Sequence, residues 1–556
     1  MTPLIRANDY TVLDPPELGS WTPGLTVSVV VPAYNGHDKL DLVLAGLAVQ
    51  SYPAGLMDVV VVDNGSSPPL RLPELRPRRT RLVVCDTPGR ADARNAGLAA
   101  AEGEVVHWLD SDVVPDRHEV EAHMRWHHLA PYLVVTGYLR FTARTPPGPE
   151  AVAEAADLAE LFEPAEPHEW LVDLVERTNG LTRAANRAFS LHVGGATSVS
   201  RRLLDDAGPM DEDLVLGQDT EMGYRLAQAG AVFVPEPRAR GYHLGPSMRM
   251  RDKQLIDRVS HATIGDRVPQ YRWLRTHPTR QWKVPYLEVV VEAAGYEDTR
   301  ATVDAVLAGT VPDVSVLLVG PWDTLVPERR APLKDPHLDL TLIHAHYAHE
   351  GRVRATPAET GRLAPFRLRL PAGWVPGEDT LARLLDLAVD GEHGLVEVLL
   401  AEGAGGVVAA RLERRAAFAR AALVAGRGDT LDDVVDDVYG SLWTDGETWG
   451  FVPASEAAPG KGRRAAYRAR LETEAEVVRL TKEAERLRGQ VAKWREESGR
   501  WRKSAVDLRR EVGTLRREVA ALKAGRLRAA IKKISARRAR PPGADGEPVA
   551  PGTESP

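Results

Sequence analysis

The feature that most constrains this chain is a series of short apolar segments that alternate with helical patterns in its first half. The apolar segments cover residues 27–31, 59–62 and 105–109, and apolar residues recur at helical spacing in 38–50 and 91–101. Strands and helices that alternate in this way predict parallel βαβ units, with strands buried on both faces. We therefore expect an α/β domain with a mostly parallel, Rossmann-like sheet.

Polar residues follow each of the three apolar segments. Tyr34 and Asn35 come after the first, Asp63 after the second, and Asp110 and Asp112 after the third. Any one of them could simply make a turn, because Asp and Asn favour turns. Ligands of such sheets, however, bind beyond the carboxyl ends of the strands. The sequence therefore predicts one shared site at this edge.

Composition excludes several classes of protein. A formal net charge of -7 and a pI near 6.2 argue against a nucleic-acid partner. The single cysteine, Cys85, excludes a disulfide scaffold, and no apolar run reaches the roughly 18–20 residues that span a bilayer. The N-terminus shows no signal-peptide pattern. We expect a cytoplasmic protein that can contact the inner face of the membrane peripherally.

The second half repeats the strand rhythm of the first. The apolar segments 289–291, 314–319 and 366–370 recur in the same order and with similar spacing. Residues 371–373, Pro-Ala-Gly, stand where the first half has Asp110-Ser111-Asp112, and Gly405-Gly406 echoes Gly194-Gly195. The segment is either a degenerate second copy of the first domain or an unrelated α/β domain, and the ordered landmarks favour the copy.

A heptad repeat occupies the end of the chain. Its d positions are Leu480, Leu487, Trp494, Trp501, Leu508, Leu515 and Leu522, and its a positions lie three residues earlier, from Val477 to Val519. Such a pattern predicts a coiled coil and therefore a homo-oligomer. The basic amphipathic segment that follows either lies on an anionic membrane or forms a solvated tail.

Four motifs of the first half resemble inverting glycosyltransferases of family 2, which have the GT-A fold. They are residues 29–35 (VVVPAYN), 61–66 (VVDNGS), 93–98 (ARNAGL) and 109–112 (LDSD), and residues 194–243 resemble the galactosyltransferase-like half of such enzymes. The expected organisation is a leader (1–24), a GT-A catalytic domain (25–250), a linker (251–283), a degenerate GT-A-like domain (284–460), a coiled coil (465–525) and a basic segment with a disordered tail (526–556).

The resemblance implies a nucleotide-sugar site that depends on a divalent metal. Mn²⁺ or Mg²⁺ prefers oxygen ligands and offsets the charge of a leaving diphosphate. The residues implied as metal ligands are Asp110, Asp112 and His243. Those implied in binding the nucleotide-sugar, with a UDP-sugar favoured, are Pro32, Ala33, Tyr34, Asp63, Arg94 and Asp110.

The resemblance also implies a catalytic base. Inversion requires a group that removes the proton of the acceptor hydroxyl, and Asp219 matches that position, with Glu221 as the fallback. The family usually has Glu-Asp where this chain has Gln218-Asp219. Both acids could instead serve only to complement a helix dipole.

The implied activity is transfer of a sugar to the hydroxyl of a glycan or lipid-linked acceptor in cell-surface polysaccharide or glycolipid synthesis. One alternative is an inactive GT-A scaffold that organises partners through its coiled coil. Another is a two-site polymerase, which the Pro-Ala-Gly sequence at 371–373 opposes because it offers no carboxylate for a metal.

Overall fold

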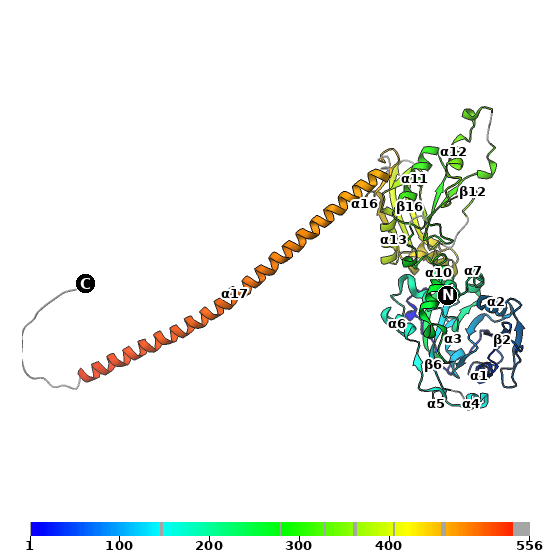
Figure 1. Ribbon diagram of the computed structural model, residues 1–556, viewed down its shortest axis with the longest axis horizontal. Helices are drawn as coiled ribbons and strands as arrows, with labels where there is room; N and C mark the ends of the chain where they lie inside the picture. The colour runs from blue at the N-terminus through cyan, green and yellow to red at the C-terminus, as the bar shows by residue number, and fades with distance from the viewer. Residues whose placement is uncertain are drawn as a thin grey trace, which may run out of the picture. The chain divides into compact units, whose positions relative to one another are not determined.

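A computed structural model describes residues 2–144, 148–277, 280–326, 330–359, 364–403, 406–457 and 463–537 (Figure 1). Residues 1–457 form one compact unit and residues 458–556 a second. Gly405 and the end of the predicted tail, 538–556, lie outside the described residues.

The first domain is built on a mixed sheet whose first half is parallel, as the sequence predicts. β1 pairs in parallel with β2 and β4, whereas β8 is antiparallel to β4 and β6. In spatial order the strands are β3 (Thr80–Val84), β2 (Met57–Asp63), β1 (Val27–Ala33), β4 (Val105–Leu109), β8 (Ala196–Ser200), β6 (Leu133–Thr142), β9 (Val232–Leu244) and β5 (Val113–Pro115), with β7 (Glu166–Pro167) beside β6.

Helices cover both faces of this sheet, so alternate strand residues enter different cores. Val30 packs in the cluster that contains Ala93 of α2, while Val29 packs in the cluster that contains Leu40 of α1. A Cβ at Gly97 of α2 would overlap Val30, so this glycine permits close helix–sheet packing. The helices are α1 (His37–Ala48), α2 (Arg90–Ala100), α3 (Glu119–His127), α4 (Pro149–Glu154), α5 (Ala159–Phe162), α6 (Glu169–Arg177), α7 (Arg201–Ala207), α8 (Gln218–Gln228), α9 (Met248–Arg251) and α10 (Lys253–Ile264), with 3₁₀ turns η1 (Tyr10–Val12), η2 (Ala185–Leu191) and η3 (Arg272–Leu274).

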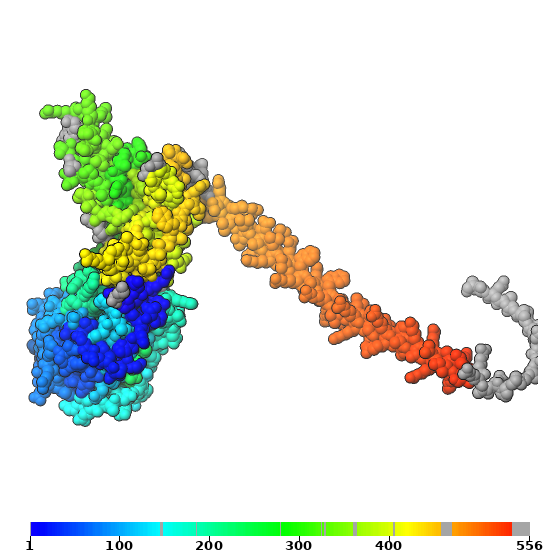
Figure 2. Space-filling view, turned by 180° about the vertical axis from the view of Figure 1, so that it is seen from behind, coloured from blue at the N-terminus to red at the C-terminus, as the bar shows by residue number. Residues whose placement is uncertain are grey.

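The segments expected as leader and linker are integral to the folded unit. Ile5 is fully buried, and Asn8 exchanges two hydrogen bonds with the backbone of Phe233, at 2.8 and 2.9 Å. Figure 2 shows the N-terminal segment in dark blue on the face of the first domain. In the linker, the buried Arg275 pairs with Asp313 of the second domain at 2.9 Å. The segment predicted as a helical linker contains a helix at Lys253–Ile264 and also packs against the domain that follows it.

The second domain has the same strand arrangement as the first. Leu287 to Val290 pair with residues 366–369 as Val27 to Val30 pair with 105–108. In spatial order the strands are β12 (Val353–Thr356), β11 (Val314–Val319), β10 (Leu287–Glu292), β13 (Phe366–Arg369), β16 (Gly406–Arg414), β15 (Leu395–Gly403) and β17 (Ser441–Asp445), with β14 (Trp374–Pro376) paired to β18 (Phe451–Pro453). The helices are α11 (Tyr296–Ala308), α12 (Leu338–Tyr347), α13 (Thr380–Asp390), α14 (Arg415–Val424), α15 (Leu431–Val438) and α16 (Gly446–Trp449), with 3₁₀ turns η4 (Trp322–Thr324) and η5 (Pro332–Lys334).

This correspondence extends to strand direction. β16 is antiparallel to β13 as β8 is to β4, and β15 is parallel to β17 as β6 is to β9. The β14–β18 pair matches β5 with β9. The second α/β domain therefore repeats the topology of the first, as the sequence landmarks indicate.

The second unit contains one long helix, α17 (Arg463–Arg537). The Leu, Val and Trp side chains of its heptad positions are 47–76% exposed. Among the described residues, no helix combines the length and apolarity needed to cross a membrane.

Candidate active site

The predicted site residues gather at the carboxyl edge of the first sheet. β2 ends at Asp63 and Asp110 follows β4, while β1 lies between these two strands. β8 runs antiparallel to β4 with Ala196 opposite Leu109, so Gly194 and Gly195 reach the same edge. The edge therefore combines backbone from β8 with side chains that follow the parallel strands.

Arg94 of α2 joins two of the predicted carboxylates. Its Nη2 donates to Asp110 Oδ1 at 2.9 Å and to the Gly194 carbonyl at 3.1 Å, and its Nη1 lies 3.4 Å from Asp219 Oδ1. Burial alone would lower the pKa of Arg94, but Asp219 and Asp110 outweigh that effect and raise it. The charged guanidinium therefore donates a hydrogen bond to Asp110 and lies within ion-pair distance of Asp219.

Two glycines make this convergence possible. A Cβ at Gly195 would lie 2.6 Å from Asp110 Oδ2, and one at Gly194 would lie 2.6 Å from Arg94 Nη2 and overlap Asp219. Larger residues at either position would displace the acidic side chains. The pair therefore has a packing role at the site.

Asp112 meets His243 where β5 pairs with β9. Val113 is opposite His243, and Asp112 Oδ1 lies 3.5 Å from His243 Nε2. Lys39 of α1 approaches the other oxygen at 3.2 Å and donates to the Leu244 carbonyl at 2.7 Å. The ammonium group of Lys39 therefore places a positive charge next to Asp112.

Of the three predicted metal ligands, Asp112 and His243 lie against each other, while Asp110 pairs with Arg94. His243 Nδ1 lies 2.7 Å from the Gly245 carbonyl, which can only accept, so Nδ1 carries the proton. The lone pair of Nε2 then lies on the side of Asp112. Metal-binding histidines are commonly oriented by such a second hydrogen bond, and carboxylate oxygens suit Mn²⁺ or Mg²⁺.

Asp63 organises its own loop. Its Oδ1 accepts from Ser66 N at 2.8 Å and its Oδ2 accepts from Leu70 N at 2.9 Å. Burial would raise the pKa of Asp63, but these hydrogen bonds lower it below its usual value. The carboxylate is 4% exposed, so the turn-making role considered from the sequence is realised here.

The other residues implied in nucleotide binding lie at the end of β1. Pro32 and Ala33 are the last residues of this strand, and Ala33 pairs with Asp63 of β2. The Tyr34 ring is 64% exposed beyond them. An exposed aromatic face next to an ordered loop is suited to contact with a base.

Asp219 and Glu221 have different surroundings, although both lie in the first turn of α8. Asp219 faces Arg94, and its backbone carbonyl lies 2.8 Å from Nδ1 of the buried His192. Both oxygens of Glu221 accept from Arg225, at 2.8 and 2.9 Å. The structure therefore brings Asp219, but not Glu221, into contact with Arg94. Gln218, where the family usually has Glu, is buried.

Comparison with known proteins identifies the domain that carries this site. Residues 28–152 match the family described as Glycosyl transferase family 2. The chain contains a family 2 glycosyltransferase domain. The match extends from the second residue of β1 through β2, β3 and β4 and includes the Asp110–Asp112 segment.

Among the relatives of the glycosyltransferase domain, the chondroitin synthase of Escherichia coli is 24% identical over 389 residues, which are 63% of this chain and 53% of the relative. A pre-mycofactocin glycosyltransferase of Mycobacterium tuberculosis is 29% identical over 225 residues, 39% of this chain and 42% of the relative. The chain thus spans about half of each of these relatives.

Solved structures resemble the chain more distantly. A mannosyltransferase from Pyrobaculum calidifontis, in complex with GDP-Man and Mn²⁺, is 20% identical and covers 50% of this chain and 68% of its own, with a TM-score of 0.31. Residues 1–349 of Staphylococcus aureus TarS, in complex with UDP, are 20% identical. This match covers 43% of this chain and 65% of the TarS chain, with a TM-score of 0.29.

Sequence reasoning missed two residues that contact the predicted site residues. Lys39 sits in the first turn of an amphipathic helix, where a lysine reads as a solvated residue. His192 lies in a loosely patterned segment, and burial lowers its pKa, so its neutral ring supports the Asp219 backbone. A pairing between distant parts of the chain brings each of them to the site, and no local motif marks them.

Proposed function

We propose that the chain is an inverting glycosyltransferase that moves a sugar from a nucleotide-diphospho-sugar to an acceptor hydroxyl. The observation that carries this proposal is the convergence of Asp110, Asp219 and Arg94, beside the Asp112–His243 pair. In this proposal Asp110 and Asp112 would hold the cation that receives the diphosphate, and Asp219 would be the base for the acceptor hydroxyl.

In this proposal Asp219 accepts the proton of the acceptor hydroxyl. A lone pair of the acceptor oxygen attacks the anomeric carbon of the donor sugar. The bond between that carbon and the diphosphate oxygen breaks, and its electrons leave with the diphosphate. Asp110, Asp112 and His243 would hold Mn²⁺ or Mg²⁺, whose charge offsets that of the leaving group. Arg94 keeps Asp219 oriented through a contact of 3.4 Å.

For the donor we favour a UDP-sugar, with Asp63 and Tyr34 at the base. For the acceptor we favour a cell-surface glycan or a lipid-linked precursor. Relatives named for chondroitin and for poly(ribitol-phosphate) support this class of acceptor.

The remaining segments would serve assembly. Residues 284–460 lack the acidic motif, so we propose that they bind no nucleotide–metal complex and support the first domain. The exposed heptad face of α17 would form a homo-oligomeric coiled coil, a dimer in the simplest case. Beyond the heptads, Leu527, Ile531 and Ile534 are exposed among basic residues and would contact anionic lipid.

The test is release of nucleotide from a panel of UDP- and GDP-sugars by the full-length protein, with and without Mn²⁺ and with glycan acceptors. We expect one donor to be turned over only with the metal, and the Asp112→Asn variant to be inactive. The Asp86→Asn variant is the control, because Asp86 is exposed beyond the neighbouring strand β3. If no donor is turned over and self-association persists, the alternative of a scaffold replaces the enzyme.

A further inference from the structure

A second group of metal-ligating side chains is buried between β4 and α3. His107 lies in β4, while Glu119 and His123 lie one turn apart on α3, and all three are at most 2% exposed. Nε2 of His107 is 3.0 Å from Glu119 Oε1, and Nε2 of His123 is 3.1 Å from the same oxygen. One ligand atom from each residue lies within 4.8 Å of the others.

The geometry of this group differs from that of a hydrogen-bonded cluster. Both Nε2–Oε1 distances are short. Among the described residues, however, neither the Nε2 atom of His107 nor that of His123 has a hydrogen-bond partner with acceptable alignment. Glu119 Oε2 is also buried without such a partner. Nitrogens that bind a shared ion point at the ion rather than at the neighbouring oxygen, so this misaligned arrangement is compatible with a metal between the three side chains.

Neighbouring residues orient the ring of His123. Its Nδ1 lies 2.8 Å from Ser198 Oγ, and the same hydroxyl lies 2.7 Å from Nε2 of His127. When Nδ1 donates to Ser198, the Nε2 lone pair is directed to the carboxylate side. Gly137 leaves room for this ring, because a Cβ there would lie 3.1 Å from His123 Nε2.

The donor chemistry of the group suits a transition metal. It offers two imidazole rings and one carboxylate within a shared space, and all three side chains are buried. Such a metal binds imidazole nitrogen and carboxylate oxygen after they give up their protons.

We propose that His107, Glu119 and His123 bind one divalent transition metal ion, Zn²⁺ by the chemistry of the donors. Two imidazoles and a carboxylate are a known zinc donor set, and Glu119 Oε2 can supply a fourth donor. This site is separate from the proposed Mn²⁺ or Mg²⁺ site and does not depend on the proposed function.

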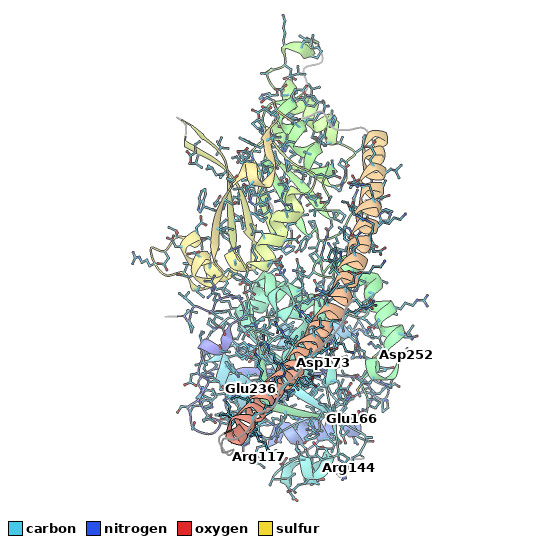
Figure 3. The ribbon with its side chains drawn as sticks, turned by 90° about the vertical axis from the view of Figure 1, so that its left-hand side faces the viewer. Arg117, Arg144, Glu166, Asp173, Glu236 and Asp252 are labelled. Carbon is cyan, nitrogen blue, oxygen red and sulfur yellow. The ribbon has the colours of Figure 1, made fainter. Side chains whose placement is uncertain are left out.

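The ion would brace the segment that carries the acidic motif. His107 precedes Asp110 by three residues, and Glu119 follows Asp112 by seven. A metal held by both flanks fixes the two ends of this segment and clamps α3 onto β4. At its C-terminal end α3 is also tied to β9, because Arg125 pairs with Glu236, which is labelled in Figure 3.

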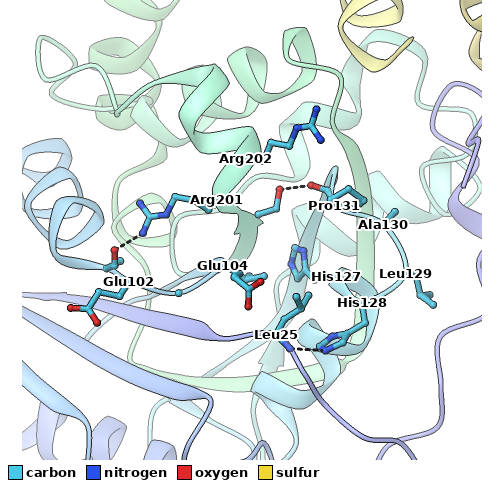
Figure 4. Close-up of a pocket in the computed structure, with 14 residues that line it drawn as sticks. Leu25, Glu102, Glu104, His127, His128, Leu129, Ala130, Pro131, Arg201 and Arg202 are labelled. Carbon is cyan, nitrogen blue, oxygen red and sulfur yellow. Dashed lines mark hydrogen bonds between the residues drawn. The ribbon is translucent and has the colours of Figure 1, made fainter. Parts of the chain in front are cut away.

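A cavity lies near this group, toward the opposite end of the strands. Its volume is about 630 Å³, and it lies between the start of β4 and the end of α3. His127 lines this cavity (Figure 4) and contacts Ser198, which contacts His123. The cavity therefore reaches the second layer of groups around the proposed ion.

The first experiment measures metal in the full-length protein, purified without a histidine tag and desalted. We expect about one equivalent of Zn²⁺ per chain by mass spectrometry of the elements. Exchange for Co²⁺ should give visible d–d absorption, and chelation should lower Tm by about 5 °C or more, reversibly on addition of Zn²⁺. These measurements need no variant.

Variants then locate the ion. Glu119→Gln and His123→Gln should lose the Zn²⁺, whereas His118→Gln should keep it, since His118 is exposed one residue before Glu119. Asp112→Asn should also keep it, which separates this site from the proposed catalytic metal. The proposal is overturned if wild-type protein retains no metal and Zn²⁺ changes neither Tm nor the Co²⁺ spectrum, or if folded Glu119→Gln and His123→Gln proteins keep a full equivalent.

Discussion

Replacing Asp63 by Asn separates the two roles available to this carboxylate. In the structure each oxygen accepts one backbone hydrogen bond, from Ser66 and from Leu70. Asn keeps one oxygen and presents an NH₂ group to the other amide, so one bond is lost and two donors face each other. The bond that remains has a neutral acceptor in place of a charged one.

The size of the effect follows from these two bonds. A hydrogen bond to a charged acceptor contributes about 1.5–3 kcal/mol, and one between neutral groups about 0.5–1.5 kcal/mol. Losing one charged bond and weakening the other should therefore lower the free energy of unfolding by about 2–4 kcal/mol. For a cooperative domain of 150–250 residues, this lowers Tm by about 4 °C or more.

The same substitution predicts a pH dependence. Because the pKa of Asp63 is lower in the folded protein than its usual value of 3.8, its stabilisation is complete above about pH 4. It is lost as the pH falls through the folded pKa. The difference in Tm between wild type and Asp63→Asn should therefore be constant from pH 5 to 8 and shrink below pH 4.

Scanning calorimetry across this pH range, with nucleotide titrations at neutral pH, measures both roles. Asp86→Asn is the matched control, since Asp86 follows the adjacent strand and is exposed. The reasoning fails if Asp63→Asn has the Tm of wild type at every pH. If Asp63→Asn keeps the Tm of wild type but loses nucleotide affinity, Asp63 binds the base and does not stabilise its loop.

Four further outcomes are expected. Asp112→Asn should lose about 10²-fold or more in rate, and full turnover of this variant or in excess chelator would contradict the metal role. Asp219→Asn should keep donor affinity and lose about 10²- to 10⁴-fold in transfer, while Glu221→Gln should mainly lower Tm; the opposite pattern would exchange their roles. Calorimetric titration of the full chain should give one bound nucleotide–Mn²⁺ complex per chain. A second bound complex would contradict the prediction that residues 284–460 bind none. Deleting 465–556 should abolish self-association in light scattering and binding to anionic liposomes, and a monomeric full-length protein would contradict the coiled coil.

The sheet of the first domain was predictable because its strands are buried on both faces. Such strands appear as nearly continuous apolar runs, and residues 27–31, 59–62 and 105–109 correspond to β1, β2 and β4. The same signal located β10 and β11 in the second domain. Grouping of the acidic residues followed from the common edge of parallel strands, which is a property of topology.

Contacts between distant segments were not predictable in this way. Arg94 was expected at the diphosphate, and only the fold shows that it joins Asp110 to Asp219. Glu119 and His123 resemble one face of a solvated helix until α3 packs on β4. A local signal did exist for His107, which interrupts an otherwise apolar strand, since a buried strand rarely contains a polar side chain without a partner.

The two α/β domains contact each other through a buried arginine of the second domain. Arg420 of α14 is 1% exposed and donates to the carbonyl groups of Gly230 and Ala231 at 2.8 Å each, and to that of Ile5 at 3.2 Å. Gly230 follows the C-terminus of α8, whose N-terminus presents Asp219. Through this buried arginine the second domain satisfies backbone carbonyl groups of the first domain. Arg420 therefore anchors the second domain to the backbone directly after α8.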